Sequence, residues 1–235
     1  MNPLGTLGET VTIEASELEE APKHLSSVEA AALPLTGLTA WRAVMTKSQQ
    51  AKPGRNILIT GIGGGVALMA LLFASAAGAN VFVTSGSEEK LKKAKAMGAA
   101  GGVNYKEEGW EKKLVAQLPA DRKKLDAIID GAGGEIAGGV IVVYGMTISP
   151  KMPFLMSAVL QNIDVRGSTM GSRKEFADMV KFVDQKNLKP IISRTVFGLD
   201  NIDGINSLFE DMKSASQFGK LVVEVAKEDQ VSSKL

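Results

Sequence analysis

The sequence predicts an α/β fold built on a doubly wound parallel sheet, and three observations lead to this prediction. Short apolar runs rich in β-branched residues alternate with segments of helical length along most of the chain. A glycine cluster separates one such run, Ile57 to Thr60, from an apolar helix. A second run, Val81 to Thr84, follows at the distance that a βαβ unit requires. Parallel strands joined by helices account for all three observations.

The expected elements follow one another from the N-terminus. An extended segment at Glu9 to Glu14 precedes a helix from about Ser27 to Ala32 and, after Pro34, a second helix near Leu38 to Met45. Strands that are buried on both faces read as continuous apolar runs. The core strands are then 57–60, 81–84, 102–104, 127–130, 140–144 and 164–167, the core helices are 65–77, 88–97, 110–117 and 174–185, and a tail adds strands 193–197 and 221–225 around a further helix.

The glycine cluster has the spacing Gly61-x-x-Gly64-x-x-Ala67 rather than the plain G-x-G-x-x-G. Gly61 allows a sharp turn after the strand, Gly63 and Gly64 let the backbone approach phosphate oxygens, and Gly65 or Ala67 lets the helix pack closely. Glycine-rich turns also occur in folds that bind nothing, so the pattern alone is weak. Its position between a strand and a helix favours a Rossmann-like dinucleotide site, because unpaired N–H groups at a helix N-terminus suit a pyrophosphate.

The end of the second strand favours NADPH over NADH. Enzymes that use NAD usually place a carboxylate there to bind the ribose 2′-OH. This chain has Ser85, Gly86 and Ser87 instead, and the first acid is Glu88. Hydroxyl groups and open backbone suit a 2′-phosphate, and Lys90 could supply positive charge. In a purely structural alternative, which is compatible with the first, Ser87 caps a helix and Lys90 is solvated.

Composition excludes several function classes. The net charge is +1, which gives no electrostatic reason to expect nucleic acid or membrane as a partner. No apolar run is long enough to span a bilayer, and the N-terminus lacks a secretory pattern, so a cytoplasmic location is expected. The chain has no cysteine and one histidine, His24, so neither a metal site nor zinc catalysis is expected.

Motifs along nearly the whole chain resemble one enzyme family. They are AAALPLTGLTAW, AKPGRNILITGIGGGVA, VTSGSEEKLKKAKAMGA, DAIIDGAGG, GVIVVYGM, NIDVRGSTMGS and FGKLVVEV. Together they resemble the zinc-free quinone-oxidoreductase branch of the medium-chain dehydrogenase/reductase superfamily. The resemblance implies an NADPH-dependent oxidoreductase that passes a hydride to a quinone, enone or aldehyde.

The same resemblance implies roles for individual residues. Thr39 would lie near the nicotinamide as the candidate catalytic residue. Gly86, Lys90 and Tyr105 would contact the adenosine phosphate, and the turn from Gly63 to Val66 would hold the pyrophosphate. The GVIVVYGM motif would add two further cofactor contacts, Gly145 and Met146.

The chain departs from the family pattern at its beginning. Most of the β-rich catalytic domain of a full-length relative precedes the position of Met1, so only a small remnant of that domain is expected. The predicted organisation is a remnant at 1–22, a dinucleotide-binding domain at 23–189 and a C-terminal return to the remnant at 190–235. Catalysis could then be weakened or lost, and the lost cover could be restored by a partner.

A second departure lies between the strands 127–130 and 140–144. Only the nine residues GAGGEIAGG, 131–139, separate them. A crossover between parallel strands usually needs a dozen or more residues. An internal deletion near 136–138 is one explanation, and an irregular loop or a hairpin that reverses the second strand are the others.

Three function classes remain at this point. The first is an NADPH-dependent oxidoreductase, the second a module that binds NADPH without catalysis, and the third a subunit completed by a partner. A homodimer through the edge strand near 162–168 is expected, because relatives pair there and an exposed edge favours pairing.

Overall fold

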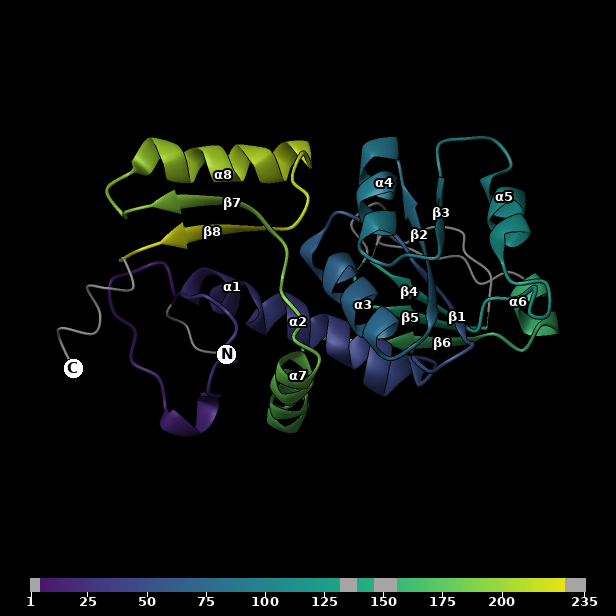
Figure 1. The fold of residues 1–235 in the computed structure, drawn as a ribbon, viewed down its shortest axis with the longest axis horizontal. Helices are drawn as coiled ribbons and strands as arrows, with labels where there is room; N and C mark the ends of the chain where they lie inside the picture. Colours follow the sequence, from purple (N-terminus) through teal and green to yellow (C-terminus); the bar gives the residue numbers. More distant parts are fainter. Residues whose placement is uncertain (1–4, 132–138, 146–155, 227–235) are drawn as a thin grey trace.

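The computed structural model describes residues 5–131, 139–145 and 156–226. Within these residues, six strands form one parallel sheet in the order β3-β2-β1-β4-β5-β6 (Figure 1). The predicted doubly wound sheet is therefore confirmed. Its strands are β1 (Asn56–Ile59), β2 (Asn80–Ser85), β3 (Gly101–Asn104), β4 (Ala127–Asp130), β5 (Val140–Val143) and β6 (Asp164–Gly167).

Helices cover both faces of this sheet. Successive side chains of a strand point to opposite faces, so Ile57 and Ile59 of β1 join one core cluster and Leu58 joins the other. The first cluster is covered by α2 (Pro34–Trp41), the π-helical η2 (Arg42–Ser48), α3 (Gly65–Ala76), α4 (Glu88–Ala96) and α7 (Arg173–Gln185). The second is covered by α5 (Trp110–Gln117) and α6 (Met156–Leu160).

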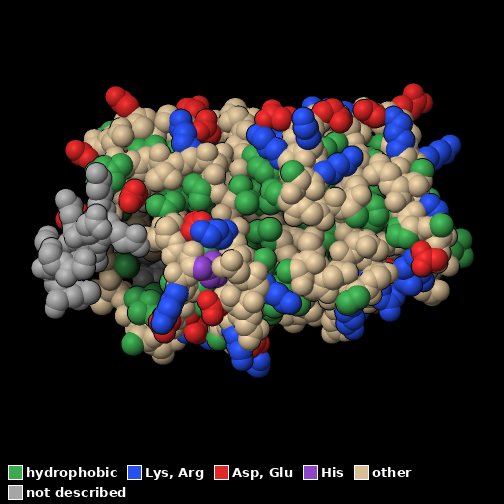
Figure 2. Space-filling model, in the orientation of Figure 1, with side chains coloured by type: hydrophobic (Ala, Val, Ile, Leu, Met, Phe, Trp, Pro, Cys, Tyr) green, Lys and Arg blue, Asp and Glu red, His purple; other side chains and the backbone are tan. Residues whose placement is uncertain are grey.

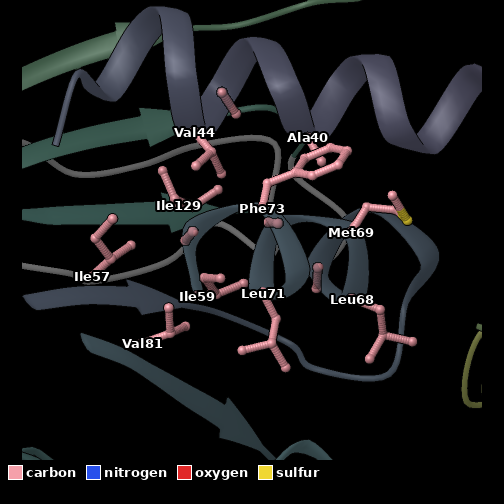
Figure 3. Close-up of a cluster of buried hydrophobic side chains, with 14 of the residues drawn as sticks. Ala40, Val44, Ile57, Ile59, Leu68, Met69, Leu71, Phe73, Val81 and Ile129 are labelled. Carbon is pink, nitrogen blue, oxygen red and sulfur yellow. The ribbon is translucent and has the colours of Figure 1, made fainter. Parts of the chain in front are cut away.

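Aromatic side chains join three helices of the larger cluster. The ring of Trp41 packs edge-on against Phe73 and Phe182, with centroids 5.5 and 5.2 Å apart. Figure 3 shows Phe73 of α3 beside Ala40 of α2. These contacts hold α3 against α2, and with it the glycine turn from which α3 begins.

A smaller unit lies beside the six-stranded sheet (Figure 1). Strands β7 (Ile192–Phe197) and β8 (Lys220–Glu224) pair in parallel, and α8 (Ile202–Ser214) connects them, as predicted for the tail. The N-terminal part adds the short helix η1 (Ala15–Glu17) and α1 (Ser27–Ala32), which begins with a capping box between Ser26 and Glu29.

β4 and β5 settle one alternative for the short connection. They pair in parallel, with Ala127 opposite Val140 and Asp130 opposite Val143. A reversing hairpin is thereby excluded, while residues 132–138 lie outside the described chain. Nine extended residues reach about 30 Å, and a four-residue strand rises only about 13 Å, so a parallel return does not require a helix.

Two short segments differ from the sequence expectation. Residues 9–14 form no regular strand and are exposed. The helix α6 is not predicted, because its apolar residues do not form one buried stripe: Ala158 is buried, whereas Met156 and Leu160 are exposed. Residues 9–14 do alternate polar and apolar side chains, but Val11 and Ile13 are exposed rather than packed on a core.

The surface carries charges of both signs. Figure 2 shows Lys and Arg side chains interspersed with Asp and Glu on the visible face, in line with the net charge of +1. None of the helices in the described ranges combines the length and the apolar character needed to cross a bilayer.

A buried carboxylate holds β1 and β4 together at the edge opposite their carboxyl ends. Asp126 accepts hydrogen bonds from the Asn56 N–H at 2.8 Å, from Arg55 Nη1 at 3.1 Å and from Arg122 Nε at 2.8 Å. Burial favours the neutral acid, but these donors outweigh it and lower the pKa of Asp126 to about 2. The carboxylate therefore stabilises the fold in its ionised form.

This network gives the chain a pH dependence of stability that Asp126→Asn should remove. Because the folded pKa is depressed, the contribution is full above the unfolded pKa of about 4 and is lost as the pH falls toward 2. Between about pH 5 and pH 2, the unaltered protein should lose up to about 2 kcal/mol more unfolding free energy than the variant. Urea unfolding at a series of pH values measures the difference, and parallel curves for the two proteins would refute the assignment.

Candidate functional site

The strand order changes direction at the centre of the sheet. From β1 the chain moves outward to β2 and β3, then returns to β4 and moves outward on the other side to β6. The carboxyl ends of β1 and β4 therefore flank a topological switch point, where open α/β sheets bind their ligands. The segment that leaves β1 at this point is the glycine turn, Gly61 to Gly65.

Hydrogen bonds fasten the glycine turn to the end of β2. The Ile62 N–H donates to the Thr84 carbonyl at 2.8 Å, and the Gly61 N–H donates to Thr84 Oγ1 at 3.2 Å. Gly61 and Gly63 have φ angles of +67° and +126°, which other residues rarely adopt. The turn is thus a fixed backbone structure that requires glycine at two positions.

The first turn of α3 presents its N–H groups at the crevice. Gly64 is the N-cap, and no side chain caps the helix there. A Cβ on Gly64 would meet only the Gly61 carbonyl oxygen, at 4.0 Å. A Cβ on Gly65 would instead come within 2.9 Å of Lys220 Cδ and 3.0 Å of Thr36 Cγ2. Gly65 therefore permits close packing, whereas Gly64 borders open space beside a positive helix end.

The predicted adenosine end brings residues of β2 and β3 together. A Cβ on Gly86 would lie 2.9 Å from the hydroxyl of Tyr105 and 2.7 Å from Lys106 Cε. Ser85 Oγ accepts a hydrogen bond from the Ser87 N–H at 3.1 Å, which shapes the loop between them. Lys106 is not among the site residues that the sequence predicts, although its position directly after Tyr105 at the end of a core strand could have indicated it.

Lys90 extends across the glycine turn. Its Nζ donates to the Ala215 carbonyl at 2.7 Å, and a Cβ on Gly63 would lie 2.9 Å from Lys90 Cδ and 3.3 Å from its Nζ. Burial lowers the pKa of the Lys90 ammonium, and the charge of Lys93 lowers it further while Glu89 partly compensates. The N-cap interpretation also holds, because Ser87 Oγ accepts from the Lys90 N–H at 3.4 Å.

The start of β8 covers the same turn from the other side. The Gly219 N–H donates to the Gly63 carbonyl at 3.1 Å, and the stem of Lys220 lies against Gly65. Burial lowers the pKa of the Lys220 ammonium. Lys220 is a second cation that the sequence analysis does not assign. Its motif, FGKLVVEV, lies far from the turn in sequence, and only the fold brings the two together.

The other predicted residues lie on α2, in the first turn of α3 and after β5. Thr39 is half-buried on α2, and its Oγ1 donates to the Leu35 carbonyl at 2.8 Å. Thr36, one turn earlier, is the threonine that packs against the glycine turn. Val66 is half-buried in the first turn of α3. Gly145 follows β5 and lines a cavity, and Met146 lies outside the described residues.

Polar groups that the sequence analysis does not assign line the switch point. Asp130 at the end of β4 is fully buried and accepts a hydrogen bond from Thr60 Oγ1 at 2.6 Å. Tyr144 lies against Gly131 at the end of the neighbouring strand. Burial, together with the nearby Asp130 charge, raises the pKa of the Tyr144 phenol, which therefore stays neutral.

The described residues do not fit a zinc site. The sequence has no cysteine, and His24 Nε2 lies 2.9 Å from the Leu188 carbonyl oxygen while its Nδ1 lies 3.6 Å from Asp184. No three His, Asp or Glu side chains in the described ranges come together as metal ligands.

Comparisons with known proteins place this geometry in a family. A family model described as "Zinc-binding dehydrogenase" matches residues 65–185, just over half of the chain. The zinc-type alcohol dehydrogenase-like protein YogA of Leptosphaeria maculans is 54% identical over 233 residues, which cover 94% of this chain and 65% of that protein. A zinc-type alcohol dehydrogenase-like protein of Schizosaccharomyces pombe is 34% identical over 245 residues, covering 94% and 66%.

A solved structure is similar to this chain in both sequence and fold. The crystal structure of an NAD-dependent alcohol dehydrogenase is 32% identical, with a TM-score of 0.77 over 94% of this chain and 66% of that chain. The chain thus spans 65 to 66% of the length of these relatives. It belongs to the zinc-binding dehydrogenase family, within the medium-chain dehydrogenase/reductase superfamily that its motifs resemble.

Proposed function

We propose that this chain binds NADPH at the carboxyl ends of β1 and β4 and passes its hydride to a quinone, enone or aldehyde. One observation carries the proposal: an α3 N-terminus without a side-chain cap, at the switch point of the sheet, with open space at Gly64. Lys90 and Lys220 flank this helix end and add positive charge for a pyrophosphate.

The two ends of the dinucleotide follow from the strand order. The adenosine would lie over β2 and β3, where Gly86 lets Tyr105 and Lys106 approach the backbone closely. The nicotinamide would lie toward β4 and β5, near Thr39 and Gly145. When bound, the nicotinamide supplies a hydride, and the chain's own residues orient both reactants and exclude water.

The groups at the end of β2 support NADPH over NADH. Ser85, Gly86 and Ser87 offer hydroxyl and backbone groups, and the nearest acid in sequence, Glu88, accepts a hydrogen bond from Asn104 at 3.0 Å. Lys106 adds a cation beside Gly86. NADH is the second candidate, because the solved relative at 32% identity is described as NAD-dependent.

The expected cofactor preference is at least about tenfold for NADPH, which corresponds to ~1.4 kcal/mol for one charge-assisted phosphate contact. The positions of the two lysines separate their effects. Lys106→Ala should remove most of the preference, because Lys106 lies beside Gly86. Lys90→Ala should instead lower the affinity for both cofactors, because Lys90 lies at the turn proposed to bind the pyrophosphate. Fluorescence titrations with both cofactors measure this, with Lys92→Ala on the exposed side of α4 as control.

Equal affinities of the unaltered protein for NADPH and NADH would contradict the preference. A drop of the preference in Lys90→Ala but not in Lys106→Ala would restore Lys90 as the 2′-phosphate residue, as the sequence alone suggests.

Completion of the site by other chains forms part of the proposal. The edge strand β6 is exposed, with Val165 40% accessible, so a second copy could pair there as a homodimer. A module that binds NADPH without turnover is the alternative, because the chain spans only 65% of its relative from Leptosphaeria maculans. Turnover assays with and without added partner distinguish the two.

A further inference from the structure

A cavity of about 440 Å³ opens at the carboxyl ends of β5 and β6. Volumes of this order hold small organic ligands. It receives side chains or backbone from η2, from β5 and the residues that follow it, and from the end of β6. The lining residues are Arg42, Lys47, Val143, Tyr144, Gly145, Gly167, Ser168 and Thr169.

The charged groups of this lining are both cations. Arg42 Nη1 pairs with Glu175 Oε2 at 3.1 Å, but Arg42 Nε is buried and has no partner among the described residues. The same Glu175 oxygen also accepts from Ser172, through its N–H at 2.8 Å and its Oγ at 2.9 Å. Lys47 makes no ion pair with any described carboxylate through its ammonium. The lining of the cavity therefore contains two cations and no carboxylate, while Glu175, which pairs with Arg42, lies outside the lining.

A buried hydroxyl points to a ligand as well. Ser168 is 8% exposed, and its Oγ has no hydrogen-bond partner among the described residues. Its backbone N–H donates to the Val143 carbonyl at 2.9 Å, which fixes the residue at the cavity. A buried hydroxyl without a partner is destabilising, so a group that accepts its hydrogen bond would remove that cost. Ser168 and the two cations suit an oxyanion.

The cavity lies at the end of the sheet where the nicotinamide would bind. β5 and β6 are on the opposite side of β1 from β2 and β3. A dinucleotide whose adenosine lies over β2 and β3 therefore directs its nicotinamide toward the cavity, and Gly145 belongs to both regions. The glycine turn that suits the pyrophosphate is a separate place, three strands from β6.

We infer that this cavity binds the carboxylate or phosphate group of an anionic acceptor, through Arg42, Lys47 and the Ser168 hydroxyl. Anion binding follows from the cavity itself, and the assignment of the anion to an acceptor rests on the function proposed above. The acceptor is then a small acid that carries its reducible carbonyl or alkene beside the charged group.

The test measures binding of inorganic phosphate and of benzoate to the whole chain at constant ionic strength. Amide NMR signals of Gly145, Gly167 and Thr169 report occupancy. At least one anion should bind saturably, and the one that saturates at lower concentration identifies the group. Lys47→Gln should lower the affinity for that anion about tenfold, as expected for the loss of one charge-assisted contact. Lys52→Gln, an exposed lysine in the turn after η2, should leave binding unchanged.

Ser168→Ala provides a second variant that keeps the test valid if Lys47→Gln folds poorly. Removing an unpartnered hydroxyl should not lower the melting temperature of the ligand-free protein, but it should lower the affinity for the anion. Absence of saturable binding, or equal binding by the unaltered protein and both variants, would overturn the inference.

NADPH titrations of the same proteins separate the two proposals. Lys47→Gln should bind NADPH as the unaltered protein does. Anion binding without NADPH binding would contradict the proposed function and leave the cavity assignment standing. NADPH binding without anion binding would contradict the cavity assignment and leave the proposed function standing.

Discussion

Gly64→Val is expected to abolish NADPH binding while the cofactor-free chain keeps its fold. Gly64 has φ −73° and ψ 149°, an extended conformation that a β-branched residue adopts readily. Because the nearest atom to a Cβ there is the Gly61 oxygen at 4.0 Å, the apo protein can accommodate valine. Its methyl groups would occupy the space beside the α3 N-terminus. Affinity should fall at least about 100-fold, or ~2.7 kcal/mol, and thermal unfolding should change little.

Gly61→Ala supplies the matched control in the same turn. Gly61 has φ +67°, so a side chain is strained there by about 1–2 kcal/mol whether or not a ligand is present. We expect this variant to lower the unfolding free energy of the apo protein, which Gly64→Val should do much less. Unfolding of the apo protein by Gly64→Val would mean that this glycine is structural first.

Quinone or enone reduction by this chain alone should be at least about 100-fold slower than by a full-length relative, a loss of ~2.7 kcal/mol in transition-state stabilisation. Hydride transfer requires an acceptor held within about 3.5 Å and a shielded nicotinamide. The chain spans 65% of its Leptosphaeria maculans relative. The proposed cofactor site lies within the matched part, and the unmatched part of the relative is expected to provide cover that this chain alone does not provide.

The comparison requires both proteins under one condition, with NADPH and with NADH. Turnover should be slow for this chain even at saturating cofactor, since the deficit lies in acceptor positioning. Comparable rates would contradict this expectation and would mean that a second copy or another part of the chain covers the nicotinamide.

Backbone features could be predicted from the sequence because each one has a local cause. The run Ile57 to Ile59 is apolar on both faces, which only a buried parallel strand requires, and β1 forms there. The glycine turn is predictable for a similar reason, since Gly61 and Gly63 adopt φ angles that favour glycine.

Side-chain destinations could not be predicted in the same way. Lys90 is one helical turn from Gly86 in sequence, yet its ammonium reaches the end of α8, and Lys106 lies beside Gly86 instead. Lys220 meets Gly65 only because β8 returns to the glycine turn. A long side chain has many rotamers, and the tertiary fold selects among them.

The cavity illustrates the same limit on a larger scale. Its lining residues lie between Arg42 and Thr169 in the sequence. No pattern in the sequence around Arg42 indicates that it lies near Thr169 in the fold. The 131–139 connection is a different case, because its short length left open whether β5 runs parallel to β4 or is reversed. β5 takes its place beside β4 although only nine residues connect them.

Titration of the unaltered chain with NADPH, followed by nicotinamide fluorescence, tests the central claim most directly. The claim is that the glycine turn and the α3 N-terminus form a nicotinamide dinucleotide site. We expect a saturable signal with one cofactor per chain, which Lys220→Gln weakens because its cation lies at the same turn. No saturable change with either NADPH or NADH, from a chain shown to be folded, would contradict the assignment of this crevice as a cofactor site.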